Sequence, residues 1–125
     1  MIIGIGVDLV DIARIRAIIS KWDAHFLHKI YTSPEIKYCE GKNENRFQSY
    51  AGLFAAKEAF SKALGTGFCN LKWKEIEIKE DNLGKPIIYL TGKASEITSK
   101  RSITKINLSI SHTKQLAIAQ VIIEN

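Results

Sequence analysis

Cysteine, proline and long apolar runs are all scarce in this sequence of 125 residues, which has two cysteines and two prolines. Cys39 and Cys69 lie far apart and lack metal-ligand spacing, so they indicate neither a disulfide framework nor a zinc site. No run approaches the roughly 18–20 apolar residues of a membrane helix. The N-terminus has no basic segment and reaches an acid at Asp8, unlike a signal peptide. We therefore expect a cytosolic protein without a membrane partner.

The remaining composition is that of an ordinary globular protein. Apolar residues make up 46% and charged residues 25% of the chain, which excludes disorder, collagen-like repeats and a coiled coil. The length suits one domain, residues 1–125, and no internal repeat or linker is visible. Eighteen basic against thirteen acidic residues give a net charge of +5. This charge is compatible with nucleic acid, a phosphate-bearing cofactor, an anionic membrane or an acidic protein partner.

The order of apolar patterns predicts an α+β fold. Asp11 is placed to cap a helix whose buried stripe is Ile12, Ile15, Ile19 and Trp22. Ser33, followed by proline and glutamate, marks a second helix start. Strands alternate with turns in the second half, including a hairpin, so the sheet should be mainly antiparallel. We expect strands at 2–7, 76–78, 87–90, 106–111 and 116–123, a loop at 41–45, and further helices at about 48–64 and 93–100.

The helix at 48–64 carries a candidate site. Wound at 100° per residue, one side is apolar, whereas Lys57, Glu58, Ser61 and Lys62 share an arc of about 140° on the other. Such a stripe resembles the wall of an anion or metal–phosphate site, but it also suits a solvated face with a Glu58–Lys62 pair. Phe54 within the stripe favours the first interpretation. The side predicted to be core comprises Leu53, Ala56, Ala59, Phe60, Ala63 and Leu64.

Asp8 is a second candidate, because it comes where the first strand ends. A carboxylate at that place is typical of a metal ligand or a catalytic acid. It could instead begin the following helix, although Asp11 is better placed to do so. Gly4 and Gly6 suggest a dinucleotide-binding loop, but Leu9 occupies the third glycine position, so a Rossmann motif is excluded.

Two further features each leave two interpretations open. His112 lies in a predicted turn beside Thr113 and could be structural or a phosphate contact. Arg14, Lys21 and His25 fall within roughly 40° of one another on the first helix, with Ile18 alongside. That stripe suits docking against an acidic helix, but an ordinary solvated basic face is equally compatible.

Taken together, these motifs resemble the holo-acyl-carrier-protein synthases, the small 4′-phosphopantetheinyl transferases. The resemblance covers nearly the whole chain and combines an early glycine–aspartate motif, a Phe-Ala-Ala-Lys-Glu-Ala motif and a late Ser-x-Ser-His motif. The segments that carry it are Gly4–Asp8, Phe54–Ala63, Gly65–Gly67, Asn82–Pro86 and Ser109–Thr113.

This resemblance implies an Mg²⁺-dependent enzyme of fatty-acid biosynthesis that moves the 4′-phosphopantetheine arm of coenzyme A onto a serine of an acidic apo acyl carrier protein. Asp8 and Glu58 would hold the Mg²⁺, Glu58 would act as base, and Lys62 would stabilise the leaving phosphate. The docking residues would be Arg14, Ile18, Lys21, His25 and Phe54. The coenzyme contacts would be Lys57, Ser61, Lys62, Gly65, Gly84, Lys85, Pro86, His112 and Thr113.

The resemblance also implies a homotrimer with sites between neighbouring protomers. One departure is Leu53, which stands where the family commonly has arginine, and Arg46 is the candidate replacement for that phosphate contact. Two alternatives without catalysis remain, a nucleic-acid-binding domain or a module that binds acidic proteins. Against nucleic acid, the basic residues are interspersed with acids and do not alternate with aromatic residues.

Overall fold

A computed structural model describes the backbone of residues 1–125 and every side chain except that of Asp23. It confirms the α+β class, with the predicted strands and helices present and some of them longer than expected. The elements run β1 (Ile2–Asp11), α1 (Ile12–Ile30), α2 (Ser33–Glu40), α3 (Arg46–Leu64), β2 (Ile76–Glu80), β3 (Pro86–Leu90), α4 (Gly92–Lys100), β4 (Lys105–His112) and β5 (Leu116–Glu124), with 3₁₀ turns at Asn43–Asn45 and Trp73–Glu75.

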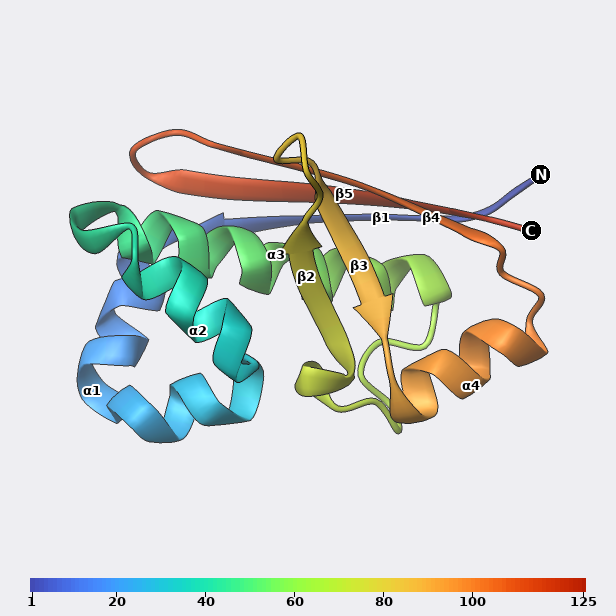
Figure 1. The fold of residues 1–125 in the computed structure, drawn as a ribbon, viewed down its shortest axis with the longest axis horizontal. Coiled ribbons are helices and arrows are strands. Elements are labelled where there is room, and N and C mark those ends of the chain that lie inside the picture. The colour runs from blue at the N-terminus through green and yellow to red at the C-terminus, as the bar shows by residue number, and fades with distance from the viewer.

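Helix α3 lies against an antiparallel sheet of order β1-β5-β4, and β2 and β3 form a separate hairpin (Figure 1). Two glycines of β1 allow this close approach. A Cβ at Gly4 would overlap the carbonyl oxygen of Ala63, and a Cβ at Gly6 would overlap that of Ala59. The strand therefore presses directly on the backbone of α3, and Asp8 follows two residues later on the same strand.

Helix α3 is buried on more than one side. The six residues predicted as its core face are all buried, which confirms that part of the prediction. However, Lys57 and Ser61 are also buried, at 0% and 1% exposure, although the sequence placed them on the polar side. The reason is that α1, α2 and β2 cover the side of α3 that faces away from the sheet.

The helix boundaries follow local capping. Asp11 caps α1 as predicted, since its carboxylate accepts a hydrogen bond from the Ala13 N–H. The cap of α2 is Thr32 rather than Ser33, and it forms a capping box with Glu35. Trp22 was expected in the buried stripe of α1, but it is 55% exposed, so that prediction was wrong. The core contacts of α1 resume after Trp22, since Phe26 and Leu27 pack against the core and Ile30 is buried.

The face of the β1-β5-β4 sheet opposite α3 carries exposed apolar side chains. Alternation along β1 turns Gly6 toward α3 and leaves Ile5, Val7 and Leu9 between 48% and 61% exposed. Leu116 and Ile118 of β5 are each 39% exposed. Figure 1 shows the helices gathered on the other side of this sheet. No helix among the described residues combines the length and apolar character that a membrane span requires.

Candidate active site

Two cavities flank α3, and the first contains the two carboxylates singled out from the sequence. Asp8 and Glu58, on α3, both line it, but Asp8 lies within β1 rather than at its end as predicted, because the strand continues to Asp11. Lys62, one turn after Glu58, donates from its Nζ to Asp8 Oδ1 at 3.0 Å and to the Val7 carbonyl oxygen at 3.1 Å. The structure thus brings Asp8, Glu58 and Lys62 together from segments that lie 50 or more residues apart.

The charges in this cluster are not balanced. Burial and then the charge of Asp8 raise the pKa of Glu58 above its ordinary value, and Lys62 opposes this in part. Two carboxylates therefore share one ammonium, which is 52% exposed and so is free to contact a ligand as well. Such a pair favours a further cation, and a carboxylate with a raised pKa is a better proton acceptor near neutral pH.

Three of the predicted docking residues line the same cavity as the carboxylates. Arg14 and Ile18 of α1 form one wall with Phe26, and Phe54 of α3 forms another. Phe54 also stacks on Trp73, with ring centroids 5.0 Å apart, which accounts for an aromatic ring on this side of α3. Lys21 and His25 are exposed farther along α1, where the Lys21 ammonium lies over the Trp22 ring.

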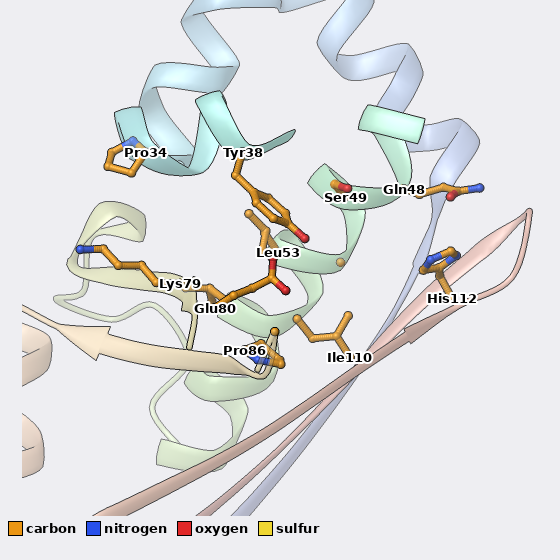
Figure 2. Close-up of a pocket in the computed structure, with 13 residues that line it drawn as sticks. Pro34, Tyr38, Gln48, Ser49, Leu53, Lys79, Glu80, Pro86, Ile110 and His112 are labelled. Atoms are coloured by element: carbon orange, nitrogen blue, oxygen red, sulfur yellow. The ribbon is translucent and has the colours of Figure 1, made fainter. Parts of the chain in front are cut away.

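The second cavity, of about 490 Å³, lies between α2, α3, the β2–β3 hairpin and β4 (Figure 2). It brings together three residues predicted to contact a coenzyme, namely Gly84, Pro86 and His112. Leu53 lines it as well, so an apolar side chain occupies the position where the resemblance suggested a phosphate contact. Arg46 instead pairs with Glu40 at 4.0 Å and lies over the Phe47 ring.

The turn that supplies Gly84 and Lys85 is organised by Asp81. Its Oδ1 accepts hydrogen bonds from the N–H groups of Leu83 and Lys85, at 2.8 and 2.9 Å. These two bonds hold the pKa of Asp81 below its ordinary value. Gly84 has φ +83°, a left-handed conformation that suits glycine. The turn is therefore preformed, with a carboxylate as its centre.

Two other predicted contacts, Gly65 and Thr113, end secondary-structure elements. Gly65 closes α3 with φ +80°. The Thr113 hydroxyl accepts hydrogen bonds from the N–H groups of Gln115 and Leu116, and so fixes the β4–β5 turn that follows His112. Both residues are exposed, so the structure leaves them available to a ligand.

Lys57 and Ser61 do not lie in either cavity, and the structure corrects their assignment as coenzyme contacts. The Lys57 ammonium is fully buried, 2.7 Å from Glu35 Oε1, and also donates to the carbonyl oxygens of Ile30 and Trp73. Ser61 donates to the Glu58 carbonyl oxygen at 2.7 Å. Neither group can reach a ligand at the surface unless the core opens.

Comparison with known proteins gives this arrangement a family. The family described as the 4′-phosphopantetheinyl transferase superfamily matches residues 4–121. This chain belongs to that superfamily. A holo-[acyl-carrier-protein] synthase of Halothermothrix orenii is 47% identical over 98% of this chain and 97% of its own length. The prediction of a phosphopantetheinyl transferase is thereby confirmed, and both alternatives without catalysis are set aside.

Solved structures of the superfamily agree in fold. The holo-[acyl-carrier-protein] synthase of Neisseria meningitidis superposes with a TM-score of 0.91 at 33% identity, covering all of both chains. That of Helicobacter pylori, solved in complex with coenzyme A, superposes with a TM-score of 0.85 at 36% identity, covering 96% of this chain and 99% of its own. The whole α+β arrangement is therefore that of the synthases.

Several residues that shape this transferase's cavities were not predicted from the sequence. Glu35 holds Lys57, Asp81 organises the glycine turn, and Tyr38 and Glu80 line the second cavity. Asp81 stands two residues before Leu83 and four before Lys85, a spacing that could have indicated an Asx turn. The other three residues meet their partners through tertiary packing, for which the sequence contains no local signal.

Proposed function

We propose that this chain transfers the 4′-phosphopantetheine arm of coenzyme A to a serine hydroxyl of an apo acyl carrier protein and releases adenosine 3′,5′-bisphosphate. The observation that carries this proposal is the first cavity, where the carboxylate pair Asp8 and Glu58 shares its walls with the docking residues Arg14, Ile18 and Phe54. A protein docked on α1 would present its serine directly to the carboxylates. The acyl carrier of fatty-acid synthesis, in the cytoplasm, is the expected acceptor.

The carboxylate pair fits a resident Mg²⁺. The described side chains contain no cluster of three or more metal-ligating groups, but Mg²⁺ typically takes one or two carboxylates together with substrate phosphate oxygens. Burial and then the charge of Asp8 raise the pKa of Glu58, and both influences would be offset by a cation bound between the two carboxylates. Asp8 and Glu58 would hold the ion, which when bound supplies Lewis-acid polarisation of the pyrophosphate.

The residues in and around this cavity account for the remaining steps. Arg14, Lys21 and His25 attract an acidic carrier protein, and Ile18 with Phe54 provides apolar contact. Glu58, directly or through water, accepts the proton of the serine hydroxyl. At the same time the serine oxygen forms a bond to the pantetheine-bearing phosphorus. The bond from this phosphorus to the bridging oxygen breaks, and the Lys62 ammonium, already oriented by Asp8, stabilises the charge that develops on the leaving phosphate.

The two cavities also support a site shared between copies of the chain. One copy places Gly84, Pro86 and His112 in the second cavity, while Asp8 and Glu58 line the first. Coenzyme A needs both kinds of contact, for its nucleotide and for its pyrophosphate. We infer that the nucleotide cavity of one copy meets the carboxylates of its neighbour.

The exposed apolar face of β1 and β5 supports such an assembly. Ile5, Val7 and Leu9 form a row of exposed side chains on one sheet face, an arrangement more typical of an interface than of a solvated surface. A homotrimer closes this contact with three equivalent sites. Sedimentation equilibrium should give a mass of three chains, and a Leu9→Asp variant should shift the mass toward that of one chain. A wild-type mass of one chain would contradict the assembly.

Mass spectrometry of an apo carrier protein incubated with this chain, coenzyme A and Mg²⁺ tests the function. The expected result is a mass gain of one phosphopantetheine arm, lost when the metal is chelated. Asp8→Asn and Glu58→Gln should remain folded and lose this transfer. An unchanged carrier mass with the wild-type chain would refute the function, whereas full activity of either variant without metal would refute the two-carboxylate site.

A further inference from the structure

The second cavity contains a carboxylate at an inward-facing position of a strand. Along β2, Ile76 and Ile78 point into the core and are buried, and Glu80 returns to the same face at the end of the strand. Lys79 does not neutralise it, because the Lys79 ammonium lies 3.3 Å from Glu77 Oε1 on the opposite face. In Figure 2, Glu80 points toward Tyr38, whereas Lys79 extends away.

Tyr38 fixes this carboxylate in place. Its hydroxyl donates a hydrogen bond to Glu80, and burial together with this bond raises the pKa of Tyr38 to about 12. The phenol therefore stays a hydrogen-bond donor at neutral pH. One oxygen of Glu80 also lies beside Gly84, where a side chain would be only 3.3 Å away. The carboxylate is thus positioned between α2 and the glycine turn.

The rest of the cavity separates the Glu80 carboxylate from the His112 imidazole. Figure 2 shows His112 near Gln48, away from Glu80. In Figure 2 Ile110 lies between them, and Leu53 and Pro86 lie on either side of Glu80, so that these three residues provide apolar walls of the kind that accept a flat ring. A carboxylate repels phosphate and attracts hydrogen-bond donors, so together with the apolar walls the Glu80 end of the cavity favours a flat, neutral ligand group that carries N–H.

On the assumption that this cavity takes the nucleotide of coenzyme A, as proposed above, the base is the only part of that nucleotide that presents an N–H donor. We propose that Glu80, oriented by Tyr38, accepts a hydrogen bond from the exocyclic amine of adenine and so determines base specificity. A base with a carbonyl at that position, such as hypoxanthine, would place its oxygen against the carboxylate. The adenine nucleotide is therefore preferred for two reasons: its amine is attracted to the Glu80 carboxylate, and the carbonyl of the competing base is repelled by it.

Calorimetric titration with adenosine 3′,5′-bisphosphate and inosine 3′,5′-bisphosphate tests this assignment. The wild-type chain should bind the adenosine compound roughly 10- to 100-fold more tightly, the range expected for one hydrogen bond to a charged group. Glu80→Gln should bring the ratio of the two dissociation constants close to one, because an amide can accept from the amine or donate to the carbonyl. Tyr38→Phe should reduce the ratio, and Glu96→Gln, on the exposed face of α4, is the matched control.

The outcomes separate this inference from the proposed function. Equal binding of the two nucleotides by the wild-type chain, or an unchanged preference in Glu80→Gln, would overturn the role of Glu80 and leave the transferase activity standing. Binding of neither nucleotide would overturn the nucleotide cavity itself. Because Glu80 is exposed at the end of its strand, thermal unfolding of both variants should match that of the wild-type chain.

Discussion

Replacing Lys57 with methionine should destabilise the protein rather than merely weaken coenzyme binding. The Lys57 ammonium and the Glu35 carboxylate are both fully buried and 2.7 Å apart. Glu35 also accepts hydrogen bonds from the N–H groups of Thr32 and Ile78, at 2.9 and 2.8 Å. The pair therefore joins α2, α3 and β2 directly beside Glu58.

The magnitude follows from what Lys57→Met leaves behind. Truncating one partner of a buried ion pair costs about 3–5 kcal/mol, because the other charge stays buried without compensation. That is a large share of the roughly 5–15 kcal/mol that stabilises a typical domain. Burial is the main influence on Lys57 and lowers its pKa, while Glu35 acts in the opposite direction. The remaining carboxylate of Glu35 would have no comparable cation within reach.

Urea denaturation at a fixed protein concentration measures the effect. We expect Lys57→Met to lose about 3–5 kcal/mol of unfolding free energy, and we expect Lys57→Met/Glu35→Gln to recover at least about 1 kcal/mol, since the buried charge is gone. The control is Lys62→Met, whose ammonium is 52% exposed. Its stability should change by less than about 0.5 kcal/mol, while its transfer activity falls. Wild-type stability in Lys57→Met, together with a raised KM for coenzyme A, would refute this reasoning.

Three other changes test the geometry of the two cavities. Gly6→Ala should lower the free energy of unfolding by about 1–3 kcal/mol, because the added Cβ forces β1 away from α3, and it should reduce transfer by displacing Asp8. The control Gly41→Ala, at a residue in a right-handed helical conformation at the end of α2, should change neither stability nor transfer. Asp81→Ala should raise the KM for coenzyme A roughly twofold to tenfold, because the ligand must then order the turn; Asp81→Asn, which keeps the acceptor oxygen, should not. In a carbon-13 NMR titration the pKa of Glu58 should fall in Asp8→Asn, because one cause of its elevation is removed. Because folding raises that pKa, the contribution of Glu58 to stability should decrease as pH rises from 4.5 toward the elevated value. A pKa of Glu58 that does not move would place Asp8 too far away to matter.

The sequence was most informative where local chemistry decides the structure. The cap at Asp11, the hairpin and the apolar face of α3 all follow from short-range patterns, and all are present. The motif residues Asp8 and Glu58 were also correctly expected to lie together, and the structure adds Lys62 as the link between them.

The errors arose where tertiary packing overrides a helical wheel. A wheel assumes one core face, but α3 is covered by the sheet on one side and by α1, α2 and β2 on another. Lys57 is therefore a buried structural cation, although its position in the motif is that of a ligand contact. Trp22 shows the opposite error, since it is exposed although Ile19 before it and Ile30 after it on α1 are both buried. The division of the predicted contacts between two cavities could not be read from the sequence either, because it depends on which side of α3 each distant segment packs.

A mixture of two inactive variants tests the shared site most directly. Glu58→Ala removes a carboxylate from the first cavity, and His112→Ala removes an imidazole from the second. If each site combines the cavities of two copies, one neighbouring pair in four in a mixed assembly joins an intact Glu58 to an intact His112. The co-refolded variants should then regain about a quarter of the wild-type transfer rate. Activity no higher than that of the separate variants would contradict the account.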